Sequence, residues 1–214
     1  MVPLEQTNFA LGWSASEKTY IATHPEAGSG RLEYALAGNN LAFVLARNQA
    51  RLALGYTLQP SGPASGIGTV YRNEGAPAEW RRASFAFGLA TPASAIPVSG
   101  QKRFGGPVAL DSGVDLTIDF AAGTVSGSLY AAHSDAWGPY KPVKYDLAAI
   151  PFDRSTGRFQ TTIASPHPPL SIDLAGRLVG SSAEEIIVRF DAPVLDPYEN
   201  TWVRFPFAGR YGGS

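Results

Sequence analysis

The feature of this sequence that most restricts its fold is a two-residue alternation of apolar and polar side chains, repeated in short segments from residue 100 onward. The clearest case is residues 114–120, where four apolar residues alternate with three polar ones: Val114, Asp115, Leu116, Thr117, Ile118, Asp119 and Phe120. This alternation is typical of an antiparallel strand with one buried and one solvated face. Gly123 follows where a tight turn needs a residue that tolerates positive φ, and the alternation then resumes. The segment therefore predicts a β-hairpin.

Seven such segments, each bounded by turn-forming residues, follow in the second half of the chain, and a strand added at residues 100–104 brings the count to eight. They cover residues 100–104, 114–120, 124–131, 143–149, 157–163, 170–178, 185–191 and 201–211. Eight is the number of strands at which a closed antiparallel barrel fills its interior with side chains or holds one small ligand. Closure also removes the exposed edges of a sheet. We therefore expect an all-β chain in which an eight-stranded antiparallel β-barrel, residues 93–214, follows a small β-rich domain, residues 1–92.

The first half of the chain has weaker signals. Residues 31–58 are apolar enough for a buried helix or for strands, but glycines and prolines surround them and Asn39-Asn40 suits a hairpin turn. We expect two strands there. Residues 61–68 and 74–80 are predicted to be loops, and residues 69–72 and 82–88 are predicted to be strands.

Composition excludes several kinds of protein. The net charge of −1 leaves no broad cationic surface for phosphates, so we expect no nucleic-acid partner. The absence of cysteine excludes disulfides, thiolate metal sites and a cysteine nucleophile. No segment approaches the roughly 20 apolar residues that span a bilayer, and none resembles a signal peptide. We expect any leader or lipid anchor to belong to residues that this sequence lacks.

Four segments occur in an order and spacing that resemble the transferrin-binding protein-like solute-binding family. They are FAFGLATPASAIPVSG (residues 85–100), DFAAGTVSG (119–127), LAGRLVGSSAEE (174–185) and FAGRYG (207–212). They resemble, in turn, the start of that family's barrel, its first hairpin, its glycine-proline signature and its last strand. Two departures are Gly180-Ser181, where the family has glycine and proline, and Ile186-Ile187, where it usually has glycines.

The resemblance implies a small β "handle" domain followed by an eight-stranded barrel. Members are typically surface or periplasmic proteins of Gram-negative bacteria, often lipoproteins, with roles such as iron acquisition. They bind host proteins such as transferrin, or haem or other solutes, and have no catalytic activity. Because their host-protein contacts lie in variable loops, the resemblance assigns no binding residue in this chain.

Two loop clusters of aromatic residues are the candidate binding sites. Trp137 and Tyr140 follow the third predicted barrel strand, and Tyr198 and Trp202 follow the seventh. Connections after odd-numbered strands leave an up-and-down barrel at the same end, so these four side chains are expected to face one mouth. His133, beside the first cluster, is the candidate axial ligand if the protein binds haem. The alternative is that these aromatic residues only cover the end of the barrel.

No catalytic or metal-binding constellation is found in the sequence. His24, His133 and His167 have no metal-ligand spacing, and all three suit an ordinary place on the surface. Glu184 and Glu185 are adjacent and would point to opposite faces of a strand, which does not suit a glycosidase pair. We therefore expect no enzymatic activity and no cofactor other than haem.

Three functions remain from the sequence. The first is a non-enzymatic protein of a Gram-negative cell envelope that binds a host protein or solute through its barrel loops. The second is a lipocalin-like carrier of a small apolar ligand or haem, which would need a roomy barrel rather than one filled with Phe, Leu and Ile. The third is a carbohydrate-active β-sandwich enzyme, which would need two facing carboxylates about 5–9.5 Å apart.

Overall fold

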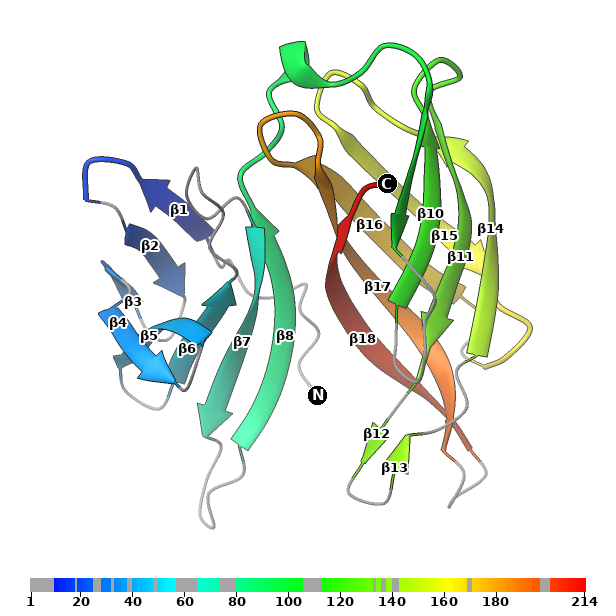
Figure 1. The fold of residues 1–214 in the computed structure, drawn as a ribbon. Helices are drawn as coiled ribbons and strands as arrows, with labels where there is room; N and C mark the ends of the chain where they lie inside the picture. The colour runs from blue at the N-terminus through cyan, green and yellow to red at the C-terminus, as the bar shows by residue number, and fades with distance from the viewer. Residues whose placement is uncertain are drawn as a thin grey trace. The chain divides into compact units, whose positions relative to one another are not determined.

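The chain forms antiparallel β-sheets in a computed structural model (Figure 1). The structure describes residues 10–17, 19–24, 28–31, 33–37, 40–47, 50–56, 65–73, 80–105, 113–132, 134–135, 138–139, 143–168, 171–196 and 201–214. Within these residues the only helical element is the short 3-10 turn Ala93–Ala95, which confirms the all-β prediction. The chain divides into two compact units, Met1–Leu89 and Ala90–Ser214, whereas the sequence placed the boundary between residues 92 and 93.

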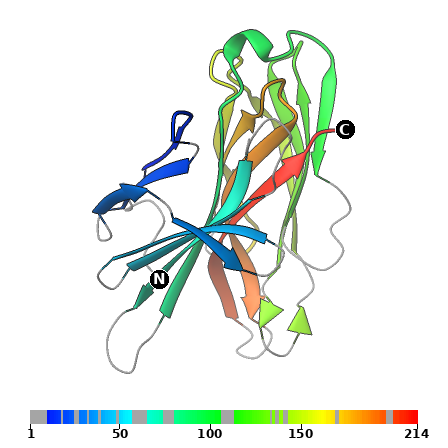
Figure 2. The same ribbon diagram turned by 60° about the vertical axis from the view of Figure 1, so that its left-hand side comes forward.

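The first unit contains a three-stranded sheet, β1-β2-β3, and a five-stranded meander, β4-β5-β6-β7-β8 (Figure 2). The strands are β1 (Ala10–Ser14), β2 (Thr19–His24), β3 (Gly28–Arg31), β4 (Glu33–Ala37), β5 (Asn40–Arg47), β6 (Ala50–Tyr56), β7 (Ser65–Asn73) and β8 (Trp80–Gly88). The predicted strands at residues 69–72 and 82–88 are confirmed as parts of β7 and β8. Residues 74–79, most of a predicted loop, lie outside the described residues.

Two predictions for this unit are wrong. Residues 31–58 form strands, as expected, but there are three complete ones, β4, β5 and β6, rather than two. The β5–β6 hairpin pairs Arg47 with Ala50, and the sequence between them has no glycine or proline to indicate a turn. The predicted loop at residues 61–68 is also too long, because β7 begins at Ser65. Its Gly66 and Gly68 lie opposite aromatic residues of β8, a pairing that local propensity does not reveal.

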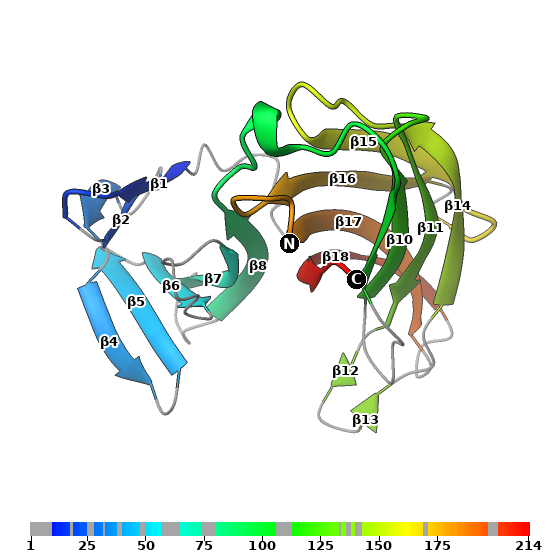
Figure 3. The same cartoon turned by 45° about the horizontal axis from the view of Figure 1, so that its top comes forward.

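The second unit has eight long strands in two four-stranded antiparallel sheets, β14-β11-β10-β9 and β15-β16-β17-β18 (Figure 3). They are β9 (Gln101–Gly105), β10 (Gly113–Asp119), β11 (Thr124–Ala131), β14 (Val143–Pro151), β15 (Arg158–Ala164), β16 (Ser171–Val179), β17 (Glu185–Asp196) and β18 (Thr201–Gly212). All eight coincide with predicted strands, although β17 extends beyond its predicted end. A short hairpin, β12 (Ser134–Asp135) with β13 (Gly138–Pro139), lies in the connection between β11 and β14.

The two sheets are joined at their outer strands. The end of β18 meets β9 through a bridge between Phe104 and Gly213. There the Arg103 N–H donates to the Ser214 carbonyl at 3.3 Å, and the Ser214 N–H donates to the Arg103 carbonyl at 2.9 Å. On the other side, β14 runs into β15 through a tight turn closed by a bridge between Asp153 and Arg158. Within each four-stranded sheet, the long strands are paired in chain order.

One hydrophobic core lies between these two sheets, and both sheets contribute fully buried side chains to it. The largest are Phe104, Phe120, Phe190, Leu116, Ile118, Leu129, Ile172, Leu178, Ile186 and Val114. Phe190 stacks on Phe207 with ring centroids 5.0 Å apart, and Phe120 meets Phe152 edge-on at 5.9 Å. Burial of each such side chain contributes about 1.5–3 kcal/mol to folding. Among the described residues, no helix has the length and apolarity needed to span a bilayer.

Candidate functional site

Of the residues predicted to bind, the structure describes Trp202. The other four, His133, Trp137, Tyr140 and Tyr198, lie outside the described residues. The strand count behind the prediction is confirmed, because β11 and β17 are the third and seventh long strands of the second unit. The β12–β13 strand pair, the last residues of β17 and the first residues of β18 also lie at the same end of this unit (Figure 1). The shared mouth for all four aromatic side chains remains a prediction.

Trp202 is the second residue of β18 and lies directly opposite Leu195 of β17. The neighbouring Val194 is buried in the core, and successive side chains of a strand point to opposite faces. Leu195 and Trp202 are therefore on the face directed away from the core, where Leu195 is 36% exposed. This pair gives the end of the β17–β18 hairpin an apolar surface that water reaches.

His167 covers one side of this surface. Its imidazole lies almost parallel to the Trp202 indole, with ring centroids 3.8 Å apart and an angle of 9° between the planes. Sequence reasoning assigns His167 only an ordinary place on the surface and misses this contact. The available signal was the segment Ser165-Pro166-His167-Pro168, in which prolines on both sides restrict the backbone around the histidine.

Ser165 fixes the backbone that carries His167. The buried Ser165 hydroxyl accepts from the His167 N–H and donates to the His167 carbonyl, both at 3.1 Å. The buried phenol of Tyr145, on β14, donates to the Pro193 carbonyl at 2.6 Å. Burial raises the pKa of Tyr145, and a hydrogen bond with Ser165 partly offsets this rise. Tyr145, Ser165, His167 and Trp202 thus form a continuous series, here called the end cluster.

The end cluster is suited to binding rather than to acid–base chemistry. Its exposed part consists of a stacked imidazole and indole beside Leu195, a flat surface for planar or apolar groups. The Ser165 hydroxyl is occupied by the His167 backbone and does not form a nucleophile–base pair with the imidazole. Trp and other large aromatic residues are enriched among the residues that dominate binding energy at protein interfaces.

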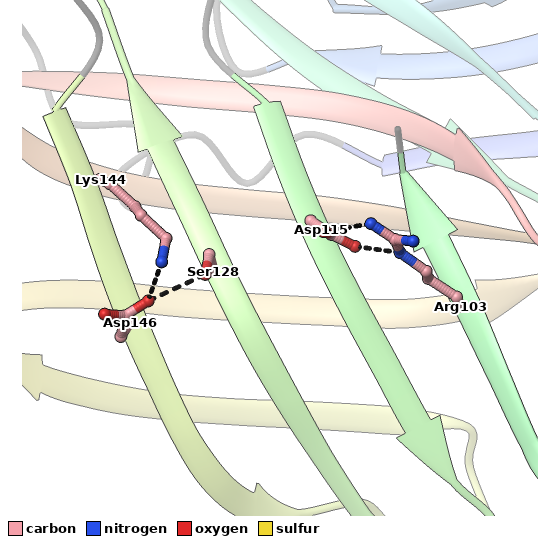
Figure 4. A network of polar contacts seen from close by, with 5 residues as sticks. All are labelled: Arg103, Asp115, Ser128, Lys144 and Asp146. Carbon is pink, nitrogen blue, oxygen red and sulfur yellow. Dashed lines mark hydrogen bonds and ion pairs between the residues drawn. The ribbon is translucent and has the colours of Figure 1, made fainter. Parts of the chain in front are cut away.

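A separate cluster of charged and polar side chains lies on the outer face of the β14-β11-β10-β9 sheet (Figure 4). Arg103 donates two hydrogen bonds of 2.6 Å to Asp115, and Asp146 accepts from Ser128 at 3.0 Å and contacts Lys144 at 2.7 Å. Arg103 lowers the pKa of Asp115, while Lys144 and then Ser128 lower that of Asp146. Each cation has its own carboxylate and needs no external ion. The Arg103–Asp115 and Ser128–Asp146 contacts link neighbouring strands, whereas Lys144 and Asp146 both lie on β14. Such exposed pairs contribute little to stability, because water and salt screen their charges.

The two adjacent glutamates have different environments. Glu184 is exposed in the turn before β17, where it accepts hydrogen bonds from Ser181 and Ser182. Glu185 is the first residue of β17 and is buried, and its Oε1 lies 3.8 Å from the Arg210 Nε. The expectation that both would lie within one strand is therefore wrong for Glu184. In the part of the chain that the structure describes, no three His, Asp or Glu side chains are grouped to hold a metal.

Comparisons with known proteins give no assignment: no family model matches the chain, and no curated protein matches it significantly.

Proposed function

We propose that the chain is a non-enzymatic binding protein whose second unit closes into an eight-stranded barrel and contacts its partner through the end cluster. The observation that carries the proposal is the His167–Trp202 stack beside the exposed Leu195. Trp202 is half-buried, and a tryptophan held in one orientation loses little conformational entropy on binding, because its neighbours already restrict it.

Closure of the barrel is supported by the hydrogen bonds between the ends of β9 and β18. Besides the paired bonds of Arg103 and Ser214, the Gly213 N–H donates to the Glu184 carbonyl at 2.8 Å. The Arg103–Ser214 bonds bring together the ends of the first and last of the eight long strands, and the Gly213 bond ties the end of the chain to the turn before β17. A closed barrel would satisfy the backbone groups that two separate sheets leave at their edges.

The filled core favours binding at the surface over a carrier function. Aromatic and aliphatic side chains from both sheets, including Phe104, Leu116 and Phe190, are almost completely buried in the space that a lipocalin-like ligand would need. Protein interiors of this kind leave few voids larger than a water molecule. We therefore place the binding surface at the end of the barrel.

The partner is proposed to be a host protein or a planar solute such as haem, and binding is proposed to take place at the cell envelope of a Gram-negative bacterium. The sequence resemblance to transferrin-binding proteins supports this class, and an aromatic surface suits both partners. A protein partner would place an apolar or aromatic side chain against Trp202 and Leu195.

The test is to measure binding of transferrin and of haem to the whole chain and to Trp202→Ala. Val98→Ala is the matched control, because Val98 is a 76% exposed apolar residue in another part of the same unit. If Trp202 is a main contact, its truncation should weaken binding by about 30-fold or more, and the control should bind as the unchanged protein does. Equal affinities of Trp202→Ala and the unchanged protein would remove the end cluster from the interface. Binding of neither ligand would overturn this partner class.

Barrel closure has its own test, amide hydrogen exchange. Closure predicts slow exchange at Arg103 and Ser214, whose N–H groups donate across the β9–β18 junction, as slow as at neighbouring core strands. Exchange at the rate of a frayed terminus would show that the sheets stay open.

A further inference from the structure

Two arginines face each other on neighbouring strands of the second sheet. Arg158 of β15 and Arg177 of β16 are direct partners in the antiparallel register. The next residue pair, Phe159 with Gly176, has Phe159 buried in the core, so the two arginines lie on the opposite, outward face. Side chains in such a pair have Cβ atoms about 4.5–5.5 Å apart, and like charges there are destabilising. The pairing needs a compensating negative charge.

Among the described residues, no carboxylate is paired with Arg177. Its Nε is buried and has no hydrogen-bond partner among the described residues. Burial and, after it, the positive charge of Arg158 lower the pKa of Arg177. A buried N–H without an acceptor costs free energy unless a bound group accepts its hydrogen bond.

The neighbouring carboxylates are already occupied. Asp153, close to Arg158 in the chain, accepts hydrogen bonds from Ser155 and Thr156 in its own turn. Glu185 lies 3.8 Å from Arg210, farther along the same sheet. By contrast, Arg103 on the other sheet is paired with a carboxylate, because it donates two hydrogen bonds to Asp115. Arg158 and Arg177 therefore differ from the compensated cations of this unit.

We propose that Arg158 and Arg177 bind an oxyanion, such as a phosphate or sulfate group, on the outward face of β15 and β16. Guanidinium groups present planar pairs of donors that match the oxygens of phosphate and sulfate. Binding would require the Arg177 side chain to turn outward, so that the anion accepts the Nε–H that is otherwise buried and unpaired. The anion would also cancel the repulsion between the two side chains. This site is separate from the end cluster and does not depend on the proposed function.

The first test is titration with inorganic phosphate at constant ionic strength, followed by calorimetry and by the NMR signal of the Arg177 Nε–H. We expect saturable binding and a shift of that signal. Arg158→Gln should weaken phosphate binding by about tenfold or more, the equivalent of one charge-assisted hydrogen bond. Arg103→Gln, which removes an arginine already paired with Asp115, should leave the affinity unchanged. An equal loss in both variants would show general charge attraction and overturn the site.

Charge reversal gives a second, independent test. Arg158→Glu would place a carboxylate opposite Arg177, so it should abolish phosphate binding and raise the melting temperature of the second unit. Lower stability together with unchanged phosphate affinity would contradict the proposal.

The source of the phosphate group is tested with vesicles of phosphatidylglycerol and of phosphatidylcholine. Binding to the anionic vesicles alone, lost in Arg158→Glu, would support an oxyanion site that uses a lipid headgroup. Binding of inorganic phosphate without vesicle binding would support a small soluble ligand. Binding of neither by the unchanged protein would overturn the proposal.

Discussion

The imidazole of His167 lies flat on the indole of Trp202, with 3.8 Å between the ring centroids. The contact joins two segments that are not paired in the sheet. The β16–β17 ladder ends at Asp173 and Asp191, whereas the β17–β18 ladder continues to Asp196 and Thr201. The projecting end of the β17–β18 hairpin is therefore held by a side chain from the β15–β16 connection instead of by backbone pairing.

Removal of the imidazole should loosen this projecting end. We expect His167→Ala to lower the free energy of unfolding by about 0.5–1.5 kcal/mol, the usual contribution of an aromatic pair beyond its buried area. The double variant with Trp202→Ala should be less than additive, because the two rings contact each other. Chemical denaturation of all three variants measures the coupling. Additive effects would mean that the stack contributes nothing to stability.

The phenol of Tyr145 satisfies a carbonyl just beyond the point where β16 stops pairing with β17. Tyr145→Phe leaves the Pro193 carbonyl without its 2.6 Å hydrogen bond. Because the phenol is buried, the expected cost is about 1–3 kcal/mol. Denaturation by urea measures this change. Tyr130→Phe is the control, since the Tyr130 ring lies on a half-exposed position of β11, and it should change stability much less.

Gly127 occupies a position in β11 that no other residue can fill without movement. Its φ is +141°, it adjoins an irregularity in the β11–β14 register, and an added Cβ would lie 2.1 Å from the Asp115 carbonyl oxygen. We expect Gly127→Ala to destabilise the second unit by more than about 3 kcal/mol, since strain and a backbone clash act together.

Gly100 provides the matched control for this substitution. It also has positive φ, +84°, but an added Cβ would meet nothing within 4 Å. Gly100→Ala should therefore cost only the backbone strain, about 1–2 kcal/mol. Similar melting temperatures for the two alanine variants would contradict the role assigned to the Asp115 carbonyl.

Acid should weaken the turn before β17. The Ser182 N–H, followed by the hydroxyls of Ser182 and Ser181, lowers the pKa of Glu184 from 4.5 to about 2. Because the folded pKa lies below the unfolded one, this contribution to stability is complete above pH 4.5 and is lost as the pH falls towards 2. Glu184→Gln should be less stable at neutral pH and should depend less on pH in this window.

Asp153 contributes to the same acid transition from another turn. Its pKa falls from 3.8 to about 2 through hydrogen bonds from the Thr156 hydroxyl and then from Ser155. Adding Asp153→Asn to Glu184→Gln should flatten the acid profile further, measured as the melting temperature between pH 2 and neutral pH. An unchanged slope in the double variant would assign the transition to other carboxylates.

The positions of the strands in the second unit follow from the sequence alone. The alternation in residues 114–120, for example, is a local pattern, because one strand buries every second side chain whatever strand lies beside it. The same reasoning failed for β5 and β6, where the hairpin between Arg47 and Ala50 has no glycine or proline. Local signals therefore located strands but missed a turn that only strand pairing defines.

Which side chains contact each other depends on the three-dimensional arrangement of the strands. His167 and Trp202 are far apart in the chain, and their contact depends on how far the β17–β18 hairpin projects past β16. The opposition of Arg158 and Arg177 depends on the register of β15 against β16, and a slip of one residue would remove it. Register is set by the packing of the whole core, so no pattern within a single segment can determine it.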